Sequence, residues 1–161
     1  MNIYLCSTLR HFLFALLKSL NDEGQQSRII VITDQQNLDP NRFDLSVLPS
    51  TISVKFVGRK QILDRVYGKG LGLVHKLFAT ANISSKFVQE RTLKKLYECA
   101  LLNSKHDFEG TNLYLFNDRN RLARLMRLAF AEYEVIEDGL SNYTGSELSF
   151  IDRYILNKKG R

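Results

Sequence analysis

The sequence predicts an α/β domain with a Rossmann-like parallel sheet and helices on both of its faces. Two observations lead to this prediction. Short runs rich in β-branched and other apolar residues recur along the chain, and segments with apolar residues at helical spacing separate them. Strands that alternate with helices in this way are typical of parallel sheets.

The first half of the chain supplies three strands and one helix. Asn2–Cys6 predicts a strand that begins almost at the first residue, and Leu9–Leu20 predicts the helix that follows it. Arg28–Asp34 is a nearly continuous β-branched run, as expected for a strand buried on both faces of a parallel sheet. The stretch 35–50 predicts a loop with room for one helical turn, and Thr51–Val57 predicts the third strand.

Gly58–Ser104 predicts an unusually long helical region between two strands. Its first helix, 58–82, contains three glycines at positions 68, 70 and 72, where we expect an interruption. Its second helix, 84–104, can be capped by Ser84 or Ser85. The remaining predicted elements are a strand at Thr111–Asn117, a helix opened by Asp118 at 118–130, a strand at Tyr133–Glu137 and a terminal helix at 145–159.

Composition places the chain among globular proteins with one domain, 1–161. It has 161 residues, of which 44% are hydrophobic and 25% charged. No apolar run reaches the roughly 18 to 20 residues of a membrane span, and the N-terminus lacks a signal-peptide pattern, so we expect a cytoplasmic protein. Cys6 and Cys99 lie in apolar segments without metal-ligand spacing, which predicts reduced core thiols. The three histidines are too scattered to predict a metal site.

The net charge of +6 suggests an anionic partner: nucleic acid, lipid headgroups or a sugar nucleotide. Arg121, Arg124 and Arg127 share a helical flank and could bind phosphates without reading bases. The alternative, a solvated flank opposite a row of leucines, is favoured because no nucleic-acid-binding motif accompanies the arginines.

The loops that follow the strands are where an open α/β sheet binds its ligands. After the last strand, Glu137 and Asp138 precede Gly139, which permits a sharp turn. One carboxylate there can act as a general base on a hydroxyl while the other orients it. The alternative is a solvated strand-to-helix turn.

The loop after the first strand is a weaker candidate. It offers the hydroxyls of Ser7 and Thr8, either of which can cap the next helix, and places Arg10 and His11 in the first turn. The N-terminus of that helix could hold an anion. Neither a dinucleotide-binding fingerprint nor a P-loop occurs, and the glycines of "GKGLG" lie inside a helical segment.

Two stretches resemble a known family. "NIYLCSTLRHFLFALL" is similar to the opening of bacterial sialyltransferases, and "YEVIEDGLSNY" resembles their acidic motif. The closest likeness is to glycosyltransferase family 52, the lipooligosaccharide sialyltransferases. The resemblance implies the N-terminal, acceptor-side domain of a GT-B enzyme that uses CMP-sialic acid, inverts the anomeric centre and requires no metal or other cofactor.

The resemblance also implies roles for individual residues. Glu137 is the expected general base, with Asp138 as the second acidic residue. The base would deprotonate a hydroxyl of a lipooligosaccharide or capsular acceptor sugar. The expected substrate contacts are Ser7, Thr8, Arg10, His11, Gly139 and Asn142.

One departure from the family is large. Its donor-binding His-Pro motif is absent, because neither Pro40 nor Pro49 follows a histidine. We therefore expect the donor domain to be absent, whether by excision or by natural truncation, and little transferase activity from these residues alone.

Two other functions remain open on the sequence. The first is a non-catalytic interaction module, in which the helical region 58–104 could form a homodimer interface. The second, least supported, is nucleic-acid binding through the arginine flank. The basic surface could also hold the protein peripherally at an anionic inner membrane.

Overall fold

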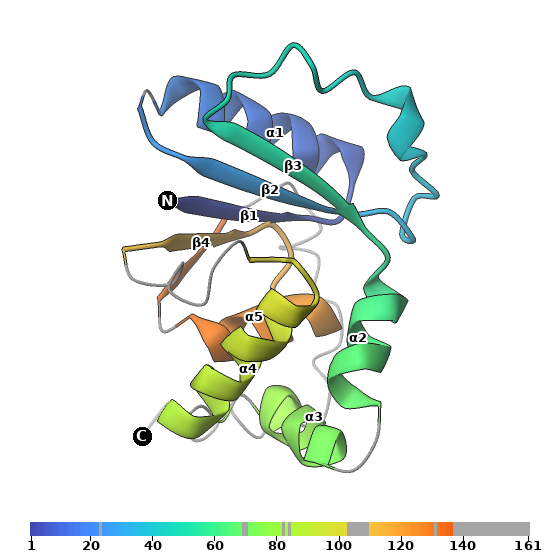
Figure 1. The fold of residues 1–161 in the computed structure, drawn as a ribbon, viewed down its shortest axis with the longest axis vertical. Coiled ribbons are helices and arrows are strands. Elements are labelled where there is room, and N and C mark those ends of the chain that lie inside the picture. The colour runs from blue at the N-terminus through green and yellow to red at the C-terminus, as the bar shows by residue number, and fades with distance from the viewer. Residues whose placement is uncertain are drawn as a thin grey trace, which may run out of the picture.

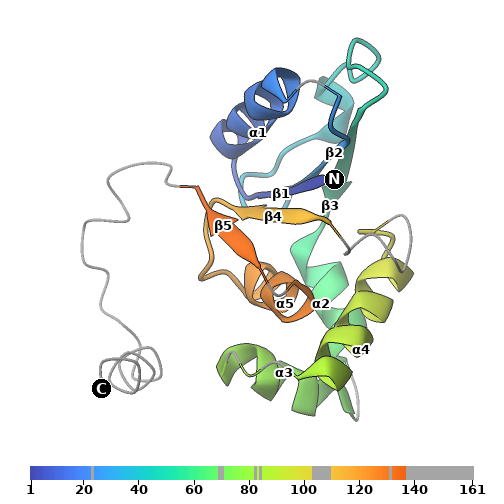
Figure 2. The ribbon, with the colours of Figure 1, turned by 90° about the vertical axis from the view of Figure 1, so that its left-hand side faces the viewer.

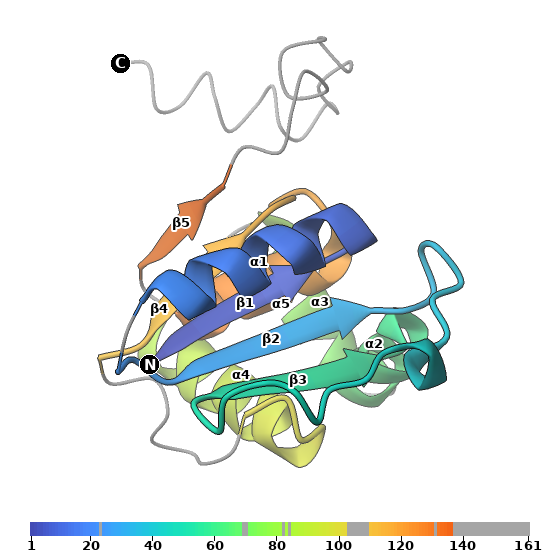
Figure 3. The ribbon, with the colours of Figure 1, turned by 90° about the horizontal axis from the view of Figure 1, so that it is seen from above.

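The computed structural model describes residues 1–22, 24–68, 71–81, 83, 85–102, 110–130 and 132–136. A sheet of five parallel strands, in the order β3-β2-β1-β4-β5, forms its centre (Figure 3). The predicted α/β, Rossmann-like class is therefore confirmed. The strands are β1 (Asn2–Cys6), β2 (Ser27–Ile32), β3 (Ile52–Val57), β4 (Asn112–Leu115) and β5 (Tyr133–Val135).

Strand β1 occupies the middle of the sheet. Its Tyr4 pairs with Ile29 of β2 on one side and with Tyr114 of β4 on the other. The chain moves outward from β1 through β2 to β3, and then crosses to the far side of β1 to form β4. The direction of winding thus reverses between β1 and β4, which is the topological switch point of the sheet.

The helices cover the two faces unequally. Helix α1 (Leu9–Asn21) lies on one face with the loop that contains the 3₁₀ turn η1 (Pro40–Arg42). The other four helices of the described residues lie on the opposite side of the sheet (Figures 1 and 2). They are α2 (Arg59–Tyr67), α3 (Leu71–Ala81), α4 (Lys86–Glu98) and α5 (Arg121–Ala129).

Alternation along β1 builds a separate core on each face. Ile3 and Leu5 pack in the core shared with α2, α4 and α5. Tyr4 and Cys6 pack in the core shared with α1. All residues of β1 and β2 are buried, as expected for central strands of a parallel sheet covered on both faces.

The predicted interruption of the helical region is confirmed. Helix α2 ends at Tyr67 and α3 begins at Leu71. Helix α4 is capped by Ser85, whose hydroxyl accepts from Val88 N–H, and it ends before Ala100, which has a φ of +54°. The predicted extent of 84–104 was therefore too long at its C-terminal end.

Two other predicted boundaries were wrong for a clear physical reason. Asp118 does not open the helix after β4, because the amide of Asn120 caps it, while Asp118 pairs with Arg127 at 3.4 Å. The strand predicted at Arg28–Asp34 ends at Ile32, since the Thr33 hydroxyl donates to the carbonyl of Val57 at the end of β3 and Asp34 accepts from Lys60 N–H in α2. The predicted terminal helix, 145–159, lies outside the described residues.

Two further features bear on the sequence predictions. The described helices do not combine the length and apolar character that a bilayer crossing requires. Cys6 and Cys99 are free thiols, and Cys6 is buried whereas Cys99 is partly exposed.

Candidate functional site

The candidate site lies at the carboxyl edge of the sheet, where the loops after β1, β2, β3 and β4 meet. Ligands of open α/β sheets bind in the crevice at the switch point of this edge. Here the switch point lies between β1 and β4. Ser7 follows β1 directly, and the residues after β4 lead to the cap of α5.

The loop after β1 is held by hydrogen bonds to the first turn of α1. Thr8 caps this helix, with its hydroxyl accepting from His11 N–H at 3.2 Å. The backbone N–H of Ser7 donates to Nδ1 of His11, also at 3.2 Å. Because Nδ1 accepts, the neutral ring carries its proton on Nε2. The ring stacks on Phe116, with centroids 4.8 Å apart, so His11 tethers β1 to the chain beyond β4.

The expected substrate contacts in this loop lie in different surroundings. Ser7 and His11 are both 3% exposed, whereas Arg10 is exposed and lies over the Phe14 ring at 5.7 Å. Thr8 uses its hydroxyl for the cap. The Ser7 hydroxyl lies 3.4 Å from the side-chain amide of Asn120, which follows β4.

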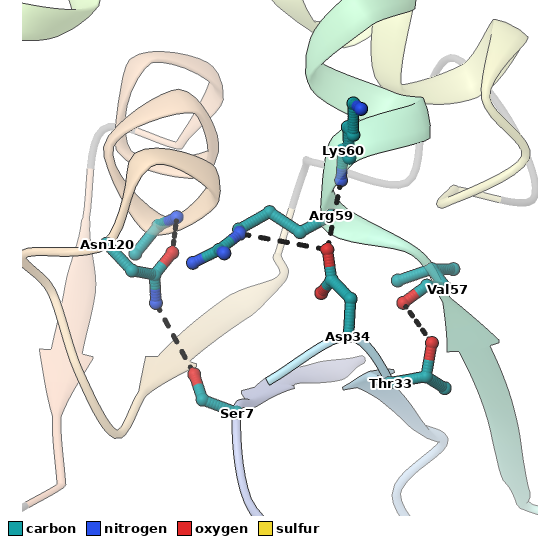
Figure 4. Close-up of polar contacts among 8 residues, drawn as sticks. Ser7, Thr33, Asp34, Val57, Arg59, Lys60 and Asn120 are labelled. Atoms are coloured by element: carbon teal, nitrogen blue, oxygen red, sulfur yellow. Dashed lines mark hydrogen bonds and ion pairs between the residues drawn. The ribbon is translucent and has the colours of Figure 1, made fainter. Parts of the chain in front are cut away.

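Asn120 connects the switch-point loops (Figure 4). Its Nδ2 lies 3.4 Å from Ser7 Oγ and donates to the Asn117 carbonyl at 2.9 Å. Its Oδ1 accepts from Ala123 N–H at 2.8 Å, which satisfies one free amide at the start of α5. A helix cap thus also holds the loop after β1 in place.

Arg59, the first residue of α2, extends toward Ser7 and Asn120 (Figure 4). Its Nε lies 3.9 Å from an oxygen of Asp34, which also accepts from Lys60 N–H at 3.2 Å. When the Gln35 amide nitrogen faces the Ser7 carbonyl, it donates there at 3.1 Å, and the amide oxygen accepts from the Arg59 guanidinium at 3.3 Å.

A continuous series of polar contacts therefore runs across the carboxyl edge. With Gln35 in that orientation, it passes from Asn120 through Ser7 and Gln35 to Arg59, and each residue lies between a different strand and the first turn of the helix that follows. The Arg59 side chain is 36% exposed, so its guanidinium is reachable from solvent.

The charge of this edge is positive. The helix N-termini contribute little to it, because several of their N–H groups are already bonded to Gln36, Asp34 and Asn120. Side chains carry the charge instead, and basic ones outnumber acidic ones directly after the strands and at the first two positions of the helices that follow, which favours an anionic ligand. The basic residues there are Arg10, Arg59, Lys60, Arg119 and Arg121, and the acidic residues are Asp34 and Asp118. The rest of the loop after β2 adds Asp39, Asp44 and Arg42.

The predicted acidic site follows β5 in the sequence. Glu137, Asp138, Gly139 and Asn142 lie outside the described residues. The described chain reaches Ile136, whose N–H donates to the Leu115 carbonyl at 2.8 Å beside β4. Among the described residues no three His, Cys, Asp or Glu side chains are grouped so that they could hold a metal ion.

Sequence reasoning missed the residues that complete this edge: Gln35, Arg59 and Asn120. Their loops had been identified by position, since each directly follows a predicted strand. No spacing rule singled out these side chains, because the contacts join segments far apart in the sequence. Ser7 and Asn120, for example, are 113 positions apart.

Comparisons with protein-family models, with curated proteins and with solved structures found no match for this chain.

Proposed function

We propose that this chain is the acceptor-side domain of a sialyltransferase-like glycosyltransferase. The observation that carries the proposal is the basic carboxyl edge at the switch point, where Ser7, Asn120, Gln35 and Arg59 converge. Sialic acid, its CMP donor and many lipooligosaccharide acceptors are all anionic, so a positive edge with hydroxyl and amide groups suits them. The acidic sequence after β5 adds a candidate base.

The reaction is an inverting displacement. A hydroxyl oxygen of the acceptor sugar attacks the anomeric carbon of CMP-sialic acid as the bond to the CMP phosphate breaks. Glu137 takes the hydroxyl proton, and the departing phosphate keeps the bonding electrons, so this displacement requires no redox cofactor. Asp138 is the neighbouring acidic group.

Arg59 has a role that follows from its position. A guanidinium can bind a carboxylate or phosphate through two parallel N–H groups. Asp34 and Gln35 orient Arg59 without enclosing it. In the proposed function it binds an acidic group of the acceptor glycan and so helps to position the attacking hydroxyl.

The proposed location is the cytoplasm, with peripheral attachment to the inner membrane, where lipid-linked acceptors are made. A second candidate function is a non-catalytic interaction module. The exposed apolar side chains of α3 and α4, which include Leu77 and Phe87, favour this alternative.

Acceptor binding tests the domain directly. Amide NMR of the 161-residue chain, titrated with an acidic lipooligosaccharide-derived oligosaccharide, should shift the signals of Ser7, Arg59 and Asn120. Arg59→Met should weaken binding roughly tenfold, as for loss of one charge-assisted contact, while Arg42→Met in the η1 turn should not. If the oligosaccharide binds to saturation but the amide signals of the carboxyl edge do not shift, the proposed site is wrong.

Catalysis is tested in an enzyme that contains this domain. Glu137→Gln keeps the shape and removes the base, so turnover should fall by roughly 10²- to 10⁴-fold. If Asp138→Asn is inactive while Glu137→Gln is active, Asp138 is the base. If both variants stay active, the acidic sequence is only a turn.

A further inference from the structure

A cluster of exposed apolar side chains covers α3 and the start of α4, on the far side of the molecule from α1 (Figure 1). The members are 46% to 72% exposed, although large apolar side chains are normally exposed singly. This surface, named here the α3–α4 patch, consists of Leu73, Val74, Leu77, Ile83 and Phe87.

The patch is continuous and hollowed. Val74, Leu77 and Ile83 line a cavity of about 300 Å³ that is open to solvent. A smaller cavity of about 90 Å³ shares Val74 with the first and adds Phe87 and Arg91. Val74, Leu77, Ile83 and Phe87 therefore form one surface, and Leu73 lies one helical turn from Leu77 on α3.

The helices that bear the patch are positively charged. Helices α3 and α4 contain five Lys or Arg and two Asp or Glu, a net charge of +3, which is half of the +6 of the chain. Lys76 and Lys86 adjoin patch residues in sequence, and Arg91 lines the smaller cavity. Helix α3 has no acidic residue.

These two properties together select the chemistry of the partner. A second copy would bring two positive surfaces into contact, which is unfavourable at low salt. Nucleic acid would use the charge but not five exposed apolar side chains, because its affinity comes mainly from phosphate contacts. A bilayer with anionic headgroups satisfies both requirements: acyl chains receive the apolar groups and lipid phosphates pair with the cations.

We propose that the α3–α4 patch is a docking surface for an anionic lipid bilayer. Leu77 and Phe87 enter the boundary between headgroups and acyl chains, and Lys76, Lys86 and Arg91 contact lipid phosphates. The hydrogen bond between His75 and Thr92 holds α3 against α4 beneath the patch. The surface is separate from the carboxyl edge, so the inference does not depend on the proposed transferase function.

The exposed side of α1 provides a matched control. Leu13 and Leu17 there are 53% and 59% exposed, comparable to the patch residues. Helix α1 contributes Arg10 and Lys18, but the adjacent loop 34–50 contains three Asp and one Arg, so α1 and this loop together carry no net charge. Exposed apolar side chains are thus present on both sides, whereas a net positive charge of +3 accompanies them on α3 and α4 and is balanced by acidic residues beside α1.

The test is vesicle co-sedimentation of the full chain, with phosphatidylcholine vesicles that contain either no anionic lipid or about 30% phosphatidylglycerol. We expect binding only to the anionic vesicles, and weaker binding as salt is raised. Leu77→Ser with Phe87→Ser should reduce affinity roughly 100-fold. Lys76→Gln with Lys86→Gln should reduce it about 25-fold. Leu13→Ser with Leu17→Ser should leave it unchanged.

Several outcomes would overturn the inference. The first is that the chain binds no vesicles. The second is that it binds neutral vesicles as well as anionic ones. The third is that Leu13→Ser with Leu17→Ser lowers the affinity as much as Leu77→Ser with Phe87→Ser does. Analytical ultracentrifugation without lipid supplies another: a dimer that Leu77→Ser with Phe87→Ser converts to a monomer would assign the patch to a second copy. Single-stranded RNA supplies the last outcome. If the chain binds RNA but not vesicles, and RNA binding is lost in Lys76→Gln with Lys86→Gln but kept in Leu77→Ser with Phe87→Ser, the positive charge serves nucleic acid.

Discussion

His75 of α3 and Thr92 of α4 are joined by a hydrogen bond of 2.7 Å between Nε2 and Oγ1. The Thr92 hydroxyl donates its own proton to the Val88 carbonyl at 2.6 Å, so Nε2 must be the donor in this contact. The Nδ1 atom is then an unprotonated acceptor, buried and without a partner among the described residues. The neutral ring fits this site, and a charged ring does not.

This geometry predicts pH-dependent stability. Burial, followed by the positive charges of Arg91 and Lys95, lowers the pKa of His75 below its ordinary value near 6.5. Tyr67 packs edge-on against the ring, with centroids 6.0 Å apart; burial raises the pKa of Tyr67 to about 12, so it stays neutral.

The direction in which stability changes with pH follows from proton uptake by His75. The unfolded chain protonates this histidine near pH 6.5 and the folded chain does so only at lower pH, so stability falls as pH decreases below about 6.5. Urea unfolding between roughly pH 7 and pH 5 should show this loss in the wild type and a smaller loss in His75→Gln, whose amide can still donate to Thr92. If the free energy of unfolding falls equally with pH in both proteins, His75 is not the cause of the pH dependence.

Asn120 should stabilise α5 as its N-cap. Asn120→Ala removes the acceptor for Ala123 N–H and should lower the free energy of unfolding by about 1 kcal/mol. Asn120→Asp keeps that acceptor and loses only the donations to Asn117 and Ser7, so it should cost less. Urea denaturation measures both. Equal losses would mean that the amide donor, and not the cap, is the important group.

Gly72 is expected to resist substitution although it lies in a helix. A Cβ there would lie 2.8 Å from the carbonyl carbon of Tyr67 and 2.9 Å from its oxygen. Helix propensity alone predicts that Gly72→Ala stabilises by about 1 kcal/mol, but overpacking costs about 1–3 kcal/mol. We expect net destabilisation in thermal and urea unfolding. Thr80→Ala on the same helix is the control and should change stability by less than about 0.5 kcal/mol.

The two thiols should differ in reactivity. Burial raises the pKa of Cys6, which is fully buried, and also that of Cys99, which is partly exposed. The native protein should therefore react slowly through Cys99 alone with a chromogenic disulfide reagent, and through both thiols in denaturant. Cys99→Ser should abolish the native reaction. A Cys99→Ser protein that still reacts at once would show that the sheet opens around Cys6.

Much of the fold was predictable because its signals are local. The β-branched runs predict β1, β2 and β3, and helical spacing predicts α1 and α5, since the side-chain period is set by the backbone of each element alone. Glycine spacing predicts the break between α2 and α3. Element ends were less predictable: whether Asp118 or Asn120 caps α5 depends on the competing partner Arg127, nine positions from Asp118.

The sequence by itself determined the class of fold, the order of its elements and the two apolar faces of the central strands. Only the tertiary structure decided that β1 lies between β2 and β4, and hence that Ser7, Gln35, Arg59 and Asn120 share one edge. It also decided that Leu93 and Leu96 are buried while Leu77 and Phe87 are exposed. Periodicity specifies which side of an element is apolar, but the neighbour that covers that side is chosen by packing of the whole chain.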